Sequence, residues 1–461
     1  MLMKNKYIKY FSFSSVAVIV VQVLQLAIIS IVAKDLTDND FGIFTLSVLI
    51  MNFGLLLAEC GSGSFLICYG KFDRRTISTC LNINVIISLI IYFILSISII
   101  LWSEFISYIY PTPVLILSIS LLFLSCSQIP KSILEYDGNF KIIAICDMLS
   151  AFISFLIALI IYDYISPLYV MIFFSLSFSI IKTIMYFLYD KKSKYSFLID
   201  KKIMHEVRMF SSGLVLNNIL VFFSRNNDQM LIGKLIGLSQ LGNYSLAMKF
   251  SLQPILRFTS ILQRVIMPDL SKCRDSNELN LMFNKVFNLL IIVMIPMSIL
   301  IYFISDSIVE IFLGEEWSSV SIIIKTACLL PFTYSIIQLT QNIILVNKDT
   351  ILLFKIQILS TLMSVFFVFI ACYYFNVYYV AVFMTLSMIV TFIFSLYYIR
   401  KLYFISIVLD KVLIFKTIFF AFVLYIQYLF TGSFDNHYIV ISLYMFTFII
   451  LSYFLLKERL R

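Results

Sequence analysis

Long apolar stretches separated by short polar segments recur along the whole chain. Each is close to the roughly 20 residues that a helix needs to cross a bilayer core about 30 Å thick. They lack the alternation that marks barrel strands of about ten residues, and helices satisfy their own backbone hydrogen bonds in lipid. The pattern therefore predicts an all-α membrane protein with about fourteen transmembrane helices. These stretches cover residues 12–33, 41–60, 79–101, 113–130, 142–162, 167–189, 211–233, 244–267, 284–305, 321–346, 351–375, 378–399, 411–430 and 437–456.

The composition supports a chain dissolved in lipid. Hydrophobic residues make up 61% of the 461 positions and charged residues only 13%, and the mean hydropathy is +1.01. A water-soluble protein of this length needs far more polar surface. The eight cysteines are scattered without a C-x-x-C pair, so we expect neither a disulfide nor a metal site.

Positive charges predict the orientation of the chain. With a cytoplasmic N-terminus, most of the 34 lysines and arginines fall in inner loops or at inner helix ends, whereas outer loops hold only Lys34 and Lys234. This asymmetry follows the positive-inside rule and places both termini in the cytoplasm. The first apolar run is too long for a cleaved signal peptide and is interpreted as the first span. The net charge of +9 therefore reflects topology and contact with anionic lipid, and we expect no nucleic-acid partner.

An internal repeat with an offset of 200 residues relates the two halves of the chain. Six spans separate the two copies, so the halves should be parallel repeats related by an axis along the membrane normal. We expect an N-terminal lobe at 1–189, a basic cytoplasmic linker at 190–210, a C-terminal lobe at 211–400 and an appended helix pair at 401–461. The identical positions of the repeat are Lys34 and Lys234, Gly42 and Gly242, and Leu46 and Leu246.

The segment that follows the basic linker carries a family resemblance, densest over about residues 205–275. Similar motifs recur in the first half. The chain resembles the O-antigen and capsule flippases of the multidrug/oligosaccharidyl-lipid/polysaccharide superfamily. The residues that carry this resemblance are Asp228-Gln229-Met230-Leu231-Ile232-Gly233-Lys234, Leu241-Gly242-Asn243-Tyr244, Pro268-Asp269-Leu270-Ser271-Lys272, Phe41-Gly42, Glu59-Cys60-Gly61 and Asp137-Gly138-Asn139-Phe140-Lys141.

The resemblance implies a fold like that of the multidrug and toxin extrusion transporters, with two six-helix lobes around a central cavity. It implies a cargo of undecaprenyl-diphosphate-linked oligosaccharide, moved across the bacterial inner membrane without a cofactor or a catalytic site. Membrane lipids, and the polysaccharide polymerase and chain-length regulator of the same pathway, are the partners that it suggests.

Charged and amide side chains inside the spans are the candidates for a substrate path, because such groups are costly in lipid and usually functional. Asn218, Arg225 and Asp228 lie near one face of the seventh span. Arg225 is suited to a diphosphate because its guanidinium binds phosphate with two parallel hydrogen bonds. An internal pair between Arg225 and Asp228 is the alternative, since their spacing of three permits it.

A second polar stripe is predicted on the eighth span, where Lys249, Gln253 and Arg257 recur at steps of four. Arg257 lies too deep to reach the interface easily, whereas Lys249 has the alternative of extending to it. On the first span, Gln22 and Gln25 suit sugar hydroxyls or, equally, helix-to-helix hydrogen bonds. Snorkelling to the interface or pairing there suffices for four charged residues near span ends, namely Glu59, Asp147, Lys182 and Lys325.

Three other functions compete with this interpretation. A cation-drug antiporter of the same fold should have acidic residues deep within its spans, but here the charged residues at that depth are mainly the basic Arg225 and Arg257. A membrane polymerase or acyltransferase would need a large outer loop or a membrane histidine, and His205 and His437 lie in or beside loops. A flippase for the peptidoglycan precursor lipid II shares both the architecture and the cargo chemistry. The identity of the sugar and of any coupling ion stays open.

Overall fold

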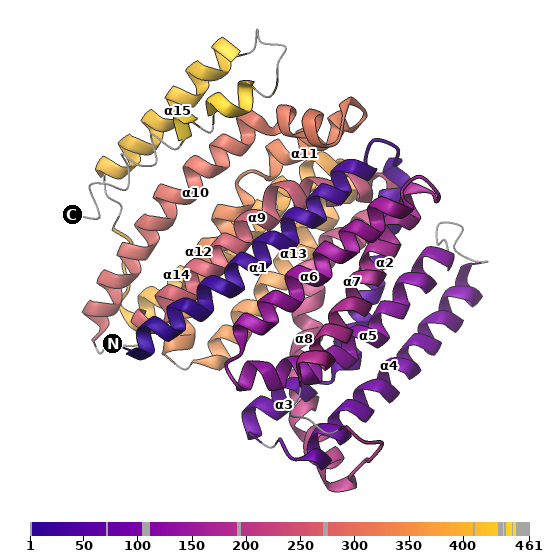
Figure 1. The fold of residues 1–461 in the computed structure, drawn as a ribbon. Coiled ribbons are helices and arrows are strands. Elements are labelled where there is room, and N and C mark those ends of the chain that lie inside the picture. The colour runs from indigo at the N-terminus through magenta and orange to yellow at the C-terminus, as the bar shows by residue number, and fades with distance from the viewer. Residues whose placement is uncertain are drawn as a thin grey trace. The chain divides into compact units, whose positions relative to one another are not determined.

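The structure is a computed structural model, and it describes residues 2–70, 72–103, 111–190, 195–270, 275–347, 349–408, 411–431, 437, 439–444 and 446–448. All regular structure in these ranges is helical, with no β-strand (Figure 1). The predicted all-α class is therefore confirmed.

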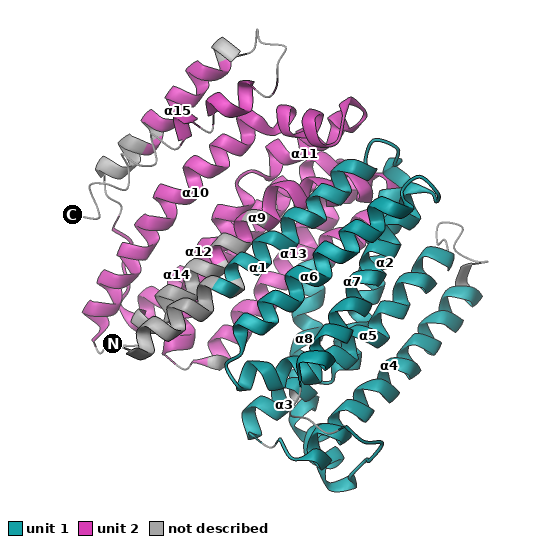
Figure 2. Cartoon of the chain, in the orientation of Figure 1, with its two compact units in different colours: residues 1–226 teal, residues 227–461 magenta. Residues whose placement is uncertain are grey.

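The chain divides into two compact units, residues Met1–Asn226 and Asn227–Arg461 (Figure 2). The division falls inside one helix, α8, so the first part of α8 packs with unit 1. The lobe and linker limits predicted from the sequence remain predictions. The helices of unit 1 are α1 (Leu2–Val32), α2 (Asp38–Glu59), α3 (Ser62–Tyr69), α4 (Arg74–Ser103), α5 (Pro111–Tyr136), α6 (Phe140–Ile161) and α7 (Pro167–Tyr189), followed by the start of α8 (Lys201–Leu235).

Unit 2 contains the end of α8 and a second series of long helices. An apolar helical stretch at Ile439–Phe448 follows α15, and the remainder of the last predicted span lies outside the described residues. The helices are α9 (Leu238–Leu270), α10 (Ser276–Phe312), the short 3-10 helix η1 (Glu315–Trp317), α11 (Ser318–Ala327), α12 (Leu330–Val346), α13 (Thr350–Tyr374), α14 (Val377–Tyr403) and α15 (Lys411–Thr431).

Eleven of the described helical stretches are long and apolar enough to cross a membrane. The two pairs α2–α3 and α11–α12 each count as one such stretch. Helix α9 has 33 residues but is too polar to be among the eleven, and α15 contributes a shorter apolar segment, Phe419–Tyr428. The chain is thus a multi-pass membrane protein, as the hydropathy pattern predicts.

The helices differ from the predicted spans mainly at their ends. Helices α8 and α10 have 35 and 37 residues, well beyond the roughly 20 that a bilayer core requires. Hydropathy detects only the lipid-embedded part of a helix, whereas backbone hydrogen bonding continues into polar sequence. The second span also ends in an unpredicted break, because Cys60 and Gly61 adopt positive φ values of 45° and 65° between α2 and α3.

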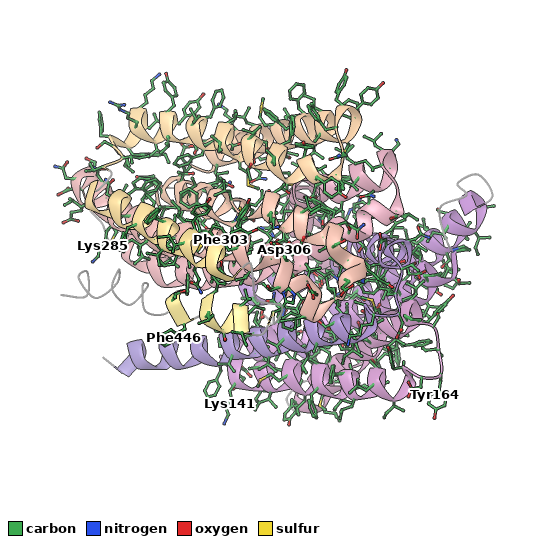
Figure 3. The ribbon with its side chains drawn as sticks, turned by 90° about the horizontal axis from the view of Figure 1, so that it is seen from above. Lys141, Tyr164, Lys285, Phe303, Asp306 and Phe446 are labelled. Carbon is green, nitrogen blue, oxygen red and sulfur yellow. The ribbon has the colours of Figure 1, made fainter. Side chains whose placement is uncertain are left out.

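Within unit 1, α5 packs against α2, α4 and α7, and α6 packs against α1 and α7. Small residues let membrane helices approach closely, and α5 buries a series of them: Ser118, Ser120, Ser125, Ser127 and Ser132. The start of α8 joins the same unit through Val207 and Phe210, which pack on an apolar cluster that includes Phe65 of α3 and Ile129 of α5. Lys141 and Tyr164 project away from unit 1 near opposite ends of α6 (Figure 3).

Within unit 2, α10 packs against α11, α12 and α15. Phe303 on α10 anchors the C-terminal helices, since its ring centroid lies 5.3 Å from that of Tyr428 and 6.3 Å from that of Tyr444 (Figure 3). Close by, Lys325 of α11 forms a 2.6 Å ion pair with Asp306 of α10. The C-terminal helices are therefore packed onto the main bundle of unit 2 by aromatic contacts.

The sequence repeat has a counterpart in local structure. Helices α2 and α9 begin at Asp38 and Leu238, at the same offset of 200 residues. Phe44 and Tyr244 occupy equivalent positions and are both buried. The next positions, Thr45 and Ser245, are buried as well, and neither hydroxyl has a hydrogen-bond partner in the described part of the chain.

Candidate functional site

A buried carboxylate marks the C-terminal part of α8. Asp228 is 7% exposed, and the hydroxyl of Tyr244 on α9 donates a 2.8 Å hydrogen bond to its Oδ2. The other carboxylate oxygen is buried without a hydrogen-bond partner among the described residues. A carboxylate in a membrane helix is costly unless it is paired, so the tyrosine stabilises it and links α8 to α9.

Two further helices of unit 2 contribute to this site. The hydroxyl of Tyr244 lies 3.3 Å from the sulfur of Met384 on α14, and the side-chain amide of Asn227 donates a 2.6 Å hydrogen bond to Ser364 on α13. We call Asn227, Asp228, Tyr244 and Ser364 the Asp228 cluster. It brings polar groups from α8, α9 and α13 together inside unit 2.

Arg225 is not part of this cluster. Its side chain is exposed, and no ion pair between Arg225 and Asp228 occurs in the region of α8 that the structure describes. The carboxylate of Asp228 instead binds Tyr244. Of the two sequence interpretations, the internal pair is therefore not observed, and the guanidinium stands on an exposed helix face. Asn218, two turns earlier on α8, is half-buried.

The polar stripe on α9 is described in part. Lys249 is half-buried and Gln253 is exposed. The backbone of Arg257 lies within α9, but its side chain lies outside the described part of the structure. Lys249 and Gln253 lie one helical turn apart on α9, and the polar stripe as a whole remains a prediction.

The two glutamines of α1 differ in environment. Gln25 is exposed, as is Arg225, its equivalent at the offset of 200. Gln22 is half-buried, and its side-chain nitrogen is buried without a hydrogen-bond partner among the described residues. The helix-to-helix bond considered for Gln22 is thus absent there. Gln22, Gln25, Asn218 and Arg225 lie in unit 1, and Asp228, Lys249, Gln253 and Arg257 in unit 2.

Unit 1 holds an ionic cluster of its own. The ammonium of Lys182 on α7 lies 2.9 Å from Asp147 on α6, and the buried Tyr186 donates a 2.8 Å hydrogen bond to the same carboxylate. Glu59, at the end of α2, accepts a hydrogen bond from Gln128 of α5. Of the two alternatives for Asp147 and Lys182, snorkelling or pairing, the structure shows the pair.

Sequence reasoning did not identify the partners Tyr244, Ser364, Gln128 and Tyr186. Tyr244 lies 16 positions from Asp228, on the next helix, and Ser364 lies 137 positions from Asn227. Partners on separate helices leave no periodic signal along the chain. A buried carboxylate nevertheless requires some hydrogen-bond donor, so the existence of such partners, though not their identity, was predictable. No group of three or more His, Cys, Asp or Glu side chains suited to a metal ion occurs in the described ranges.

Comparison with solved structures shows which known proteins share this fold. The fold is similar to that of the lipid II flippase MurJ in an inward-closed conformation, with a TM-score of 0.77, 18% identity, and coverage of 97% of this chain and 99% of that one. An inward-facing multidrug resistance transporter of the MATE family aligns with a TM-score of 0.58 and 13% identity over 86% of this chain and 94% of its own. The chain therefore shares the fold of these two proteins.

Comparison of sequences then gives the family. The chain belongs to the polysaccharide biosynthesis protein family, which matches residues 31–322. It is 20% identical over 373 residues to the lipopolysaccharide biosynthesis protein WzxC of Escherichia coli, covering 79% of this chain and 75% of that protein. It is 25% identical over 319 residues to the teichuronic acid biosynthesis protein TuaB of Bacillus subtilis, covering 67% of this chain and 64% of that protein. The predicted resemblance to polysaccharide flippases is confirmed.

Proposed function

We propose that this protein flips undecaprenyl-diphosphate-linked O-antigen or capsule repeat units across the bacterial inner membrane by alternating access. The observation that carries the proposal is the family match over residues 31–322, in a chain whose membrane helices present polar and cationic side chains. Its relatives are named for polysaccharide biosynthesis. The task is transport, so we assign no catalytic residue and no cofactor.

The chemistry of the cargo suits the exposed cation on α8. A polyprenyl-diphosphate headgroup is anionic and must cross about 30 Å of hydrocarbon. The guanidinium of Arg225 is exposed and offers two parallel hydrogen bonds to a phosphate. In this proposal Arg225 and Arg257 attract the diphosphate, with Lys249 as a further cation.

Uncharged polar side chains would form hydrogen bonds with the sugar part of the cargo. Amides both donate and accept hydrogen bonds, which matches a hydroxyl-rich oligosaccharide. Gln22, Gln25, Asn218 and Gln253 are the candidates, and the side-chain nitrogen of Gln22 has no hydrogen-bond partner within the described residues. Asp228 is assigned a supporting role, because it is already bound to Tyr244.

The orientation follows from the charge pattern. We place both termini in the cytoplasm, because Lys34 and Lys234 are the only basic residues in the predicted outer loops. Cargo would then enter from the cytoplasmic leaflet and leave in the periplasmic leaflet. The polymerase and chain-length regulator of the same pathway would receive it there.

A lipid II flippase is the second candidate, favoured by the fold similarity to MurJ. A cation-drug antiporter has less support, because Asp228, the main deep acid, is 7% exposed and bound to Tyr244. Loss of the protein should cause a different lipid to accumulate for each of the two flippase functions, and none for the antiporter. That difference provides the test.

The decisive experiment is deletion of the gene in its native strain, followed by mass spectrometry of undecaprenyl-linked lipids. We expect a complete oligosaccharide repeat unit to accumulate in the cytoplasmic leaflet, with restoration of surface polysaccharide by the wild-type gene. Accumulation of lipid II would favour the second candidate. Normal surface polysaccharide and no accumulated repeat unit would reject the proposal.

The residue assignment has its own test in the same strain. The double variant Arg225→Ala, Arg257→Ala should reduce surface polysaccharide at an unchanged level of protein in the membrane. Full export by this variant would reject the role of the two arginines while leaving the transport proposal intact.

A further inference from the structure

Residues 195–200, directly before α8, are held in place by side chains from the start of α4. The amide nitrogen of Asn82 donates hydrogen bonds of 3.0 Å to the backbone carbonyls of Ser196 and Leu198. Ser78 accepts a 3.0 Å hydrogen bond from the backbone N–H of Ser196, and Thr79 accepts one of the same length from Asp200. This extended segment is therefore fastened to unit 1 through its backbone.

In unit 2, residues 404–408, directly after α14, are held by side chains in the same way. Asn284 of α10 donates a 2.8 Å hydrogen bond to the carbonyl of Ser406 and accepts one of 2.7 Å from the N–H of Val408. Asn280 accepts a 3.0 Å hydrogen bond from the N–H of Ser406, and Asn288 donates one of 3.3 Å to the carbonyl of Val408. The three asparagines recur at steps of four, on one face of α10. We call each of these arrangements a clasp.

The clasped segments expose apolar side chains. Phe197 is 101% exposed, and the adjoining Leu198 and Ile199 are 52% and 44% exposed. In unit 2, Phe404 is 76% and Val408 60% exposed. Water would disfavour such an arrangement, because burial of a phenylalanine or leucine side chain is worth about 1.5–3 kcal/mol. Both clasps thus present apolar groups that need an apolar environment.

The clasps also make these segments compatible with a membrane surface. An irregular backbone is excluded from lipid chiefly because its N–H and C=O groups lose their hydrogen bonds with water. Here the side chains of Asn82 and Asn284 bind backbone groups at Ser196, Leu198, Ser406 and Val408. The segments can therefore leave water with much of that penalty removed.

Charge identifies the surface. The exposed lysines Lys201 and Lys202 directly follow the first clasped segment, and the exposed Arg400 and Lys401 precede the second. Each segment lies directly at the end of a long helix, where a spanning chain passes the headgroup region. Apolar side chains beside basic residues are the pattern that binds the interface of an anionic membrane.

We propose that the two clasped connections are membrane anchors, which insert Phe197 and Phe404 with their neighbours among the headgroups of an anionic phospholipid leaflet. The clasps hold the backbone while the side chains enter the acyl boundary and the adjacent basic residues contact the anionic headgroups. The inference uses the membrane orientation of the proposed function but not the identity of the cargo. It can therefore fail while oligosaccharide export is confirmed.

Fluorescence of a Phe197→Trp variant in lipid nanodiscs tests the proposal, with the unsubstituted protein supplying the background. In nanodiscs that contain phosphatidylglycerol, the added emission should be shifted to the blue of a water-exposed tryptophan. A phospholipid with a doxyl group near the headgroup should quench it more than aqueous iodide does. Adding Lys201→Gln and Lys202→Gln should remove the difference between phosphatidylglycerol and phosphatidylcholine nanodiscs. A Phe404→Trp variant repeats the test in unit 2 if Phe197→Trp does not fold.

The opposite result is equally clear. Emission typical of water, strong quenching by iodide and none by doxyl lipid in anionic nanodiscs would overturn the proposal. Protection from iodide in native membranes but not in nanodiscs of the purified protein would also overturn it, because a protein partner would then cover the segment.

Discussion

The hydroxyl of Tyr244 donates a 2.8 Å hydrogen bond to the carboxylate of Asp228, and this bond connects α8 to α9 where both side chains are buried. A hydrogen-bonded pair in this position stabilises the helix hairpin of α8 and α9. Arg225 and Asp228 are three residues apart but do not form an ion pair in the described structure. The arginine is thereby left to interact with something other than its own helix.

Removing the tyrosine hydroxyl should destabilise unit 2. Tyr244→Phe leaves the buried carboxylate of Asp228 without this donor, and we expect a loss of about 1–3 kcal/mol, the cost of an unsatisfied buried polar group. Thermal unfolding of the detergent-solubilised protein measures it. Tyr379→Phe is the control, because Tyr379 is 47% exposed and its substitution should change stability by less than about 0.5 kcal/mol. Equal effects of the two substitutions would contradict the role of the bond.

Arg225 should determine the rate of export. Loss of a charge-assisted hydrogen bond to the cargo costs about 1.5–3 kcal/mol, so Arg225→Ala should lower the initial rate of polysaccharide export by about 10- to 100-fold. Arg225→Lys keeps the charge but loses the planar fork, and an intermediate rate is expected. Pulse labelling of surface polysaccharide gives the rates.

The matched control for Arg225 is Lys234→Ala. Lys234 is exposed at the end of the same helix, in a predicted outer loop, so its removal should leave the rate unchanged. If both alanine variants export at the wild-type rate, the diphosphate does not depend on Arg225.

The ion pair of unit 1 should contribute to stability because each of its two poorly solvated charges neutralises the other. Lys182 and Asp147 have side chains only 18% and 24% exposed, so Lys182→Met leaves a poorly solvated carboxylate bound to Tyr186 alone. We expect the free energy of unfolding to fall by about 3 kcal/mol, at the lower end of the range for breaking a buried pair. The double variant Lys182→Met, Asp147→Asn should recover part of it. Unfolding temperatures measured in detergent test this expectation. A double variant that is less stable than either single variant would show that the two charges do not neutralise each other.

Asp73 should make a contribution to the stability of unit 1 that is lost in acid. Its carboxylate, just before α4, accepts hydrogen bonds of 2.6 Å from the hydroxyl and 3.1 Å from the backbone N–H of Thr76. Chiefly the side-chain bond lowers the pKa of Asp73 below its usual value. A lowered pKa in the folded state means that the contribution is present above about pH 4, the ordinary pKa. It is lost as the pH falls through the lower folded value.

Comparison with Asp73→Asn tests this linkage. The asparagine can still cap a helix but does not titrate. The difference in unfolding temperature between wild type and Asp73→Asn should therefore shrink as the pH is lowered from 6 towards 3, because aspartate carboxylates ordinarily become protonated with a pKa of about 3.9. A difference that stays constant over this range would show that the ionised carboxylate has no special role.

The clasp of unit 1 should protect its segment from solvent exchange. Asn82→Ala removes both hydrogen bonds to the carbonyls of Ser196 and Leu198. We expect faster hydrogen–deuterium exchange at the amides of Ser196 and Asp200, measured by mass spectrometry of the peptide that contains them. Asn139→Ala is the control, since Asn139 forms no side-chain cap on α6. Unchanged exchange in Asn82→Ala would mean that Ser78 and Thr79 hold the segment alone.

Much of the fold was predictable because lipid imposes a simple rule on each span. Apolar length locates a helix whatever its neighbours are, and the repeat of Gly42 and Gly242 placed α2 and α9 in register. Helix ends were less predictable, since α8 and α10 continue through polar sequence outside the lipid. The break at Cys60 and Gly61 depends on local backbone angles, which hydropathy does not report.

The candidate site shows where sequence reasoning ends. Spacing identified Asp228 as a costly intramembrane acid but offered Arg225 as its partner, because only residues on the same helix can be compared by period. The actual partner, Tyr244, is reached through the turn between α8 and α9. Sequence patterns did not predict the clasps for the same reason, since Asn82 and Ser196 are separated by 114 positions.

The row of buried serines on α5 affects how mutational maps of this protein should be interpreted. Ser118, Ser125 and Ser132 are spaced seven apart and are buried in a helix that packs against α2, α4 and α7, so larger residues at these positions would force the helices apart. Saturation mutagenesis scored by surface polysaccharide should therefore show a strip of intolerant positions along α5. That strip would report the closeness of two backbones and would not be evidence that the sugar passes there.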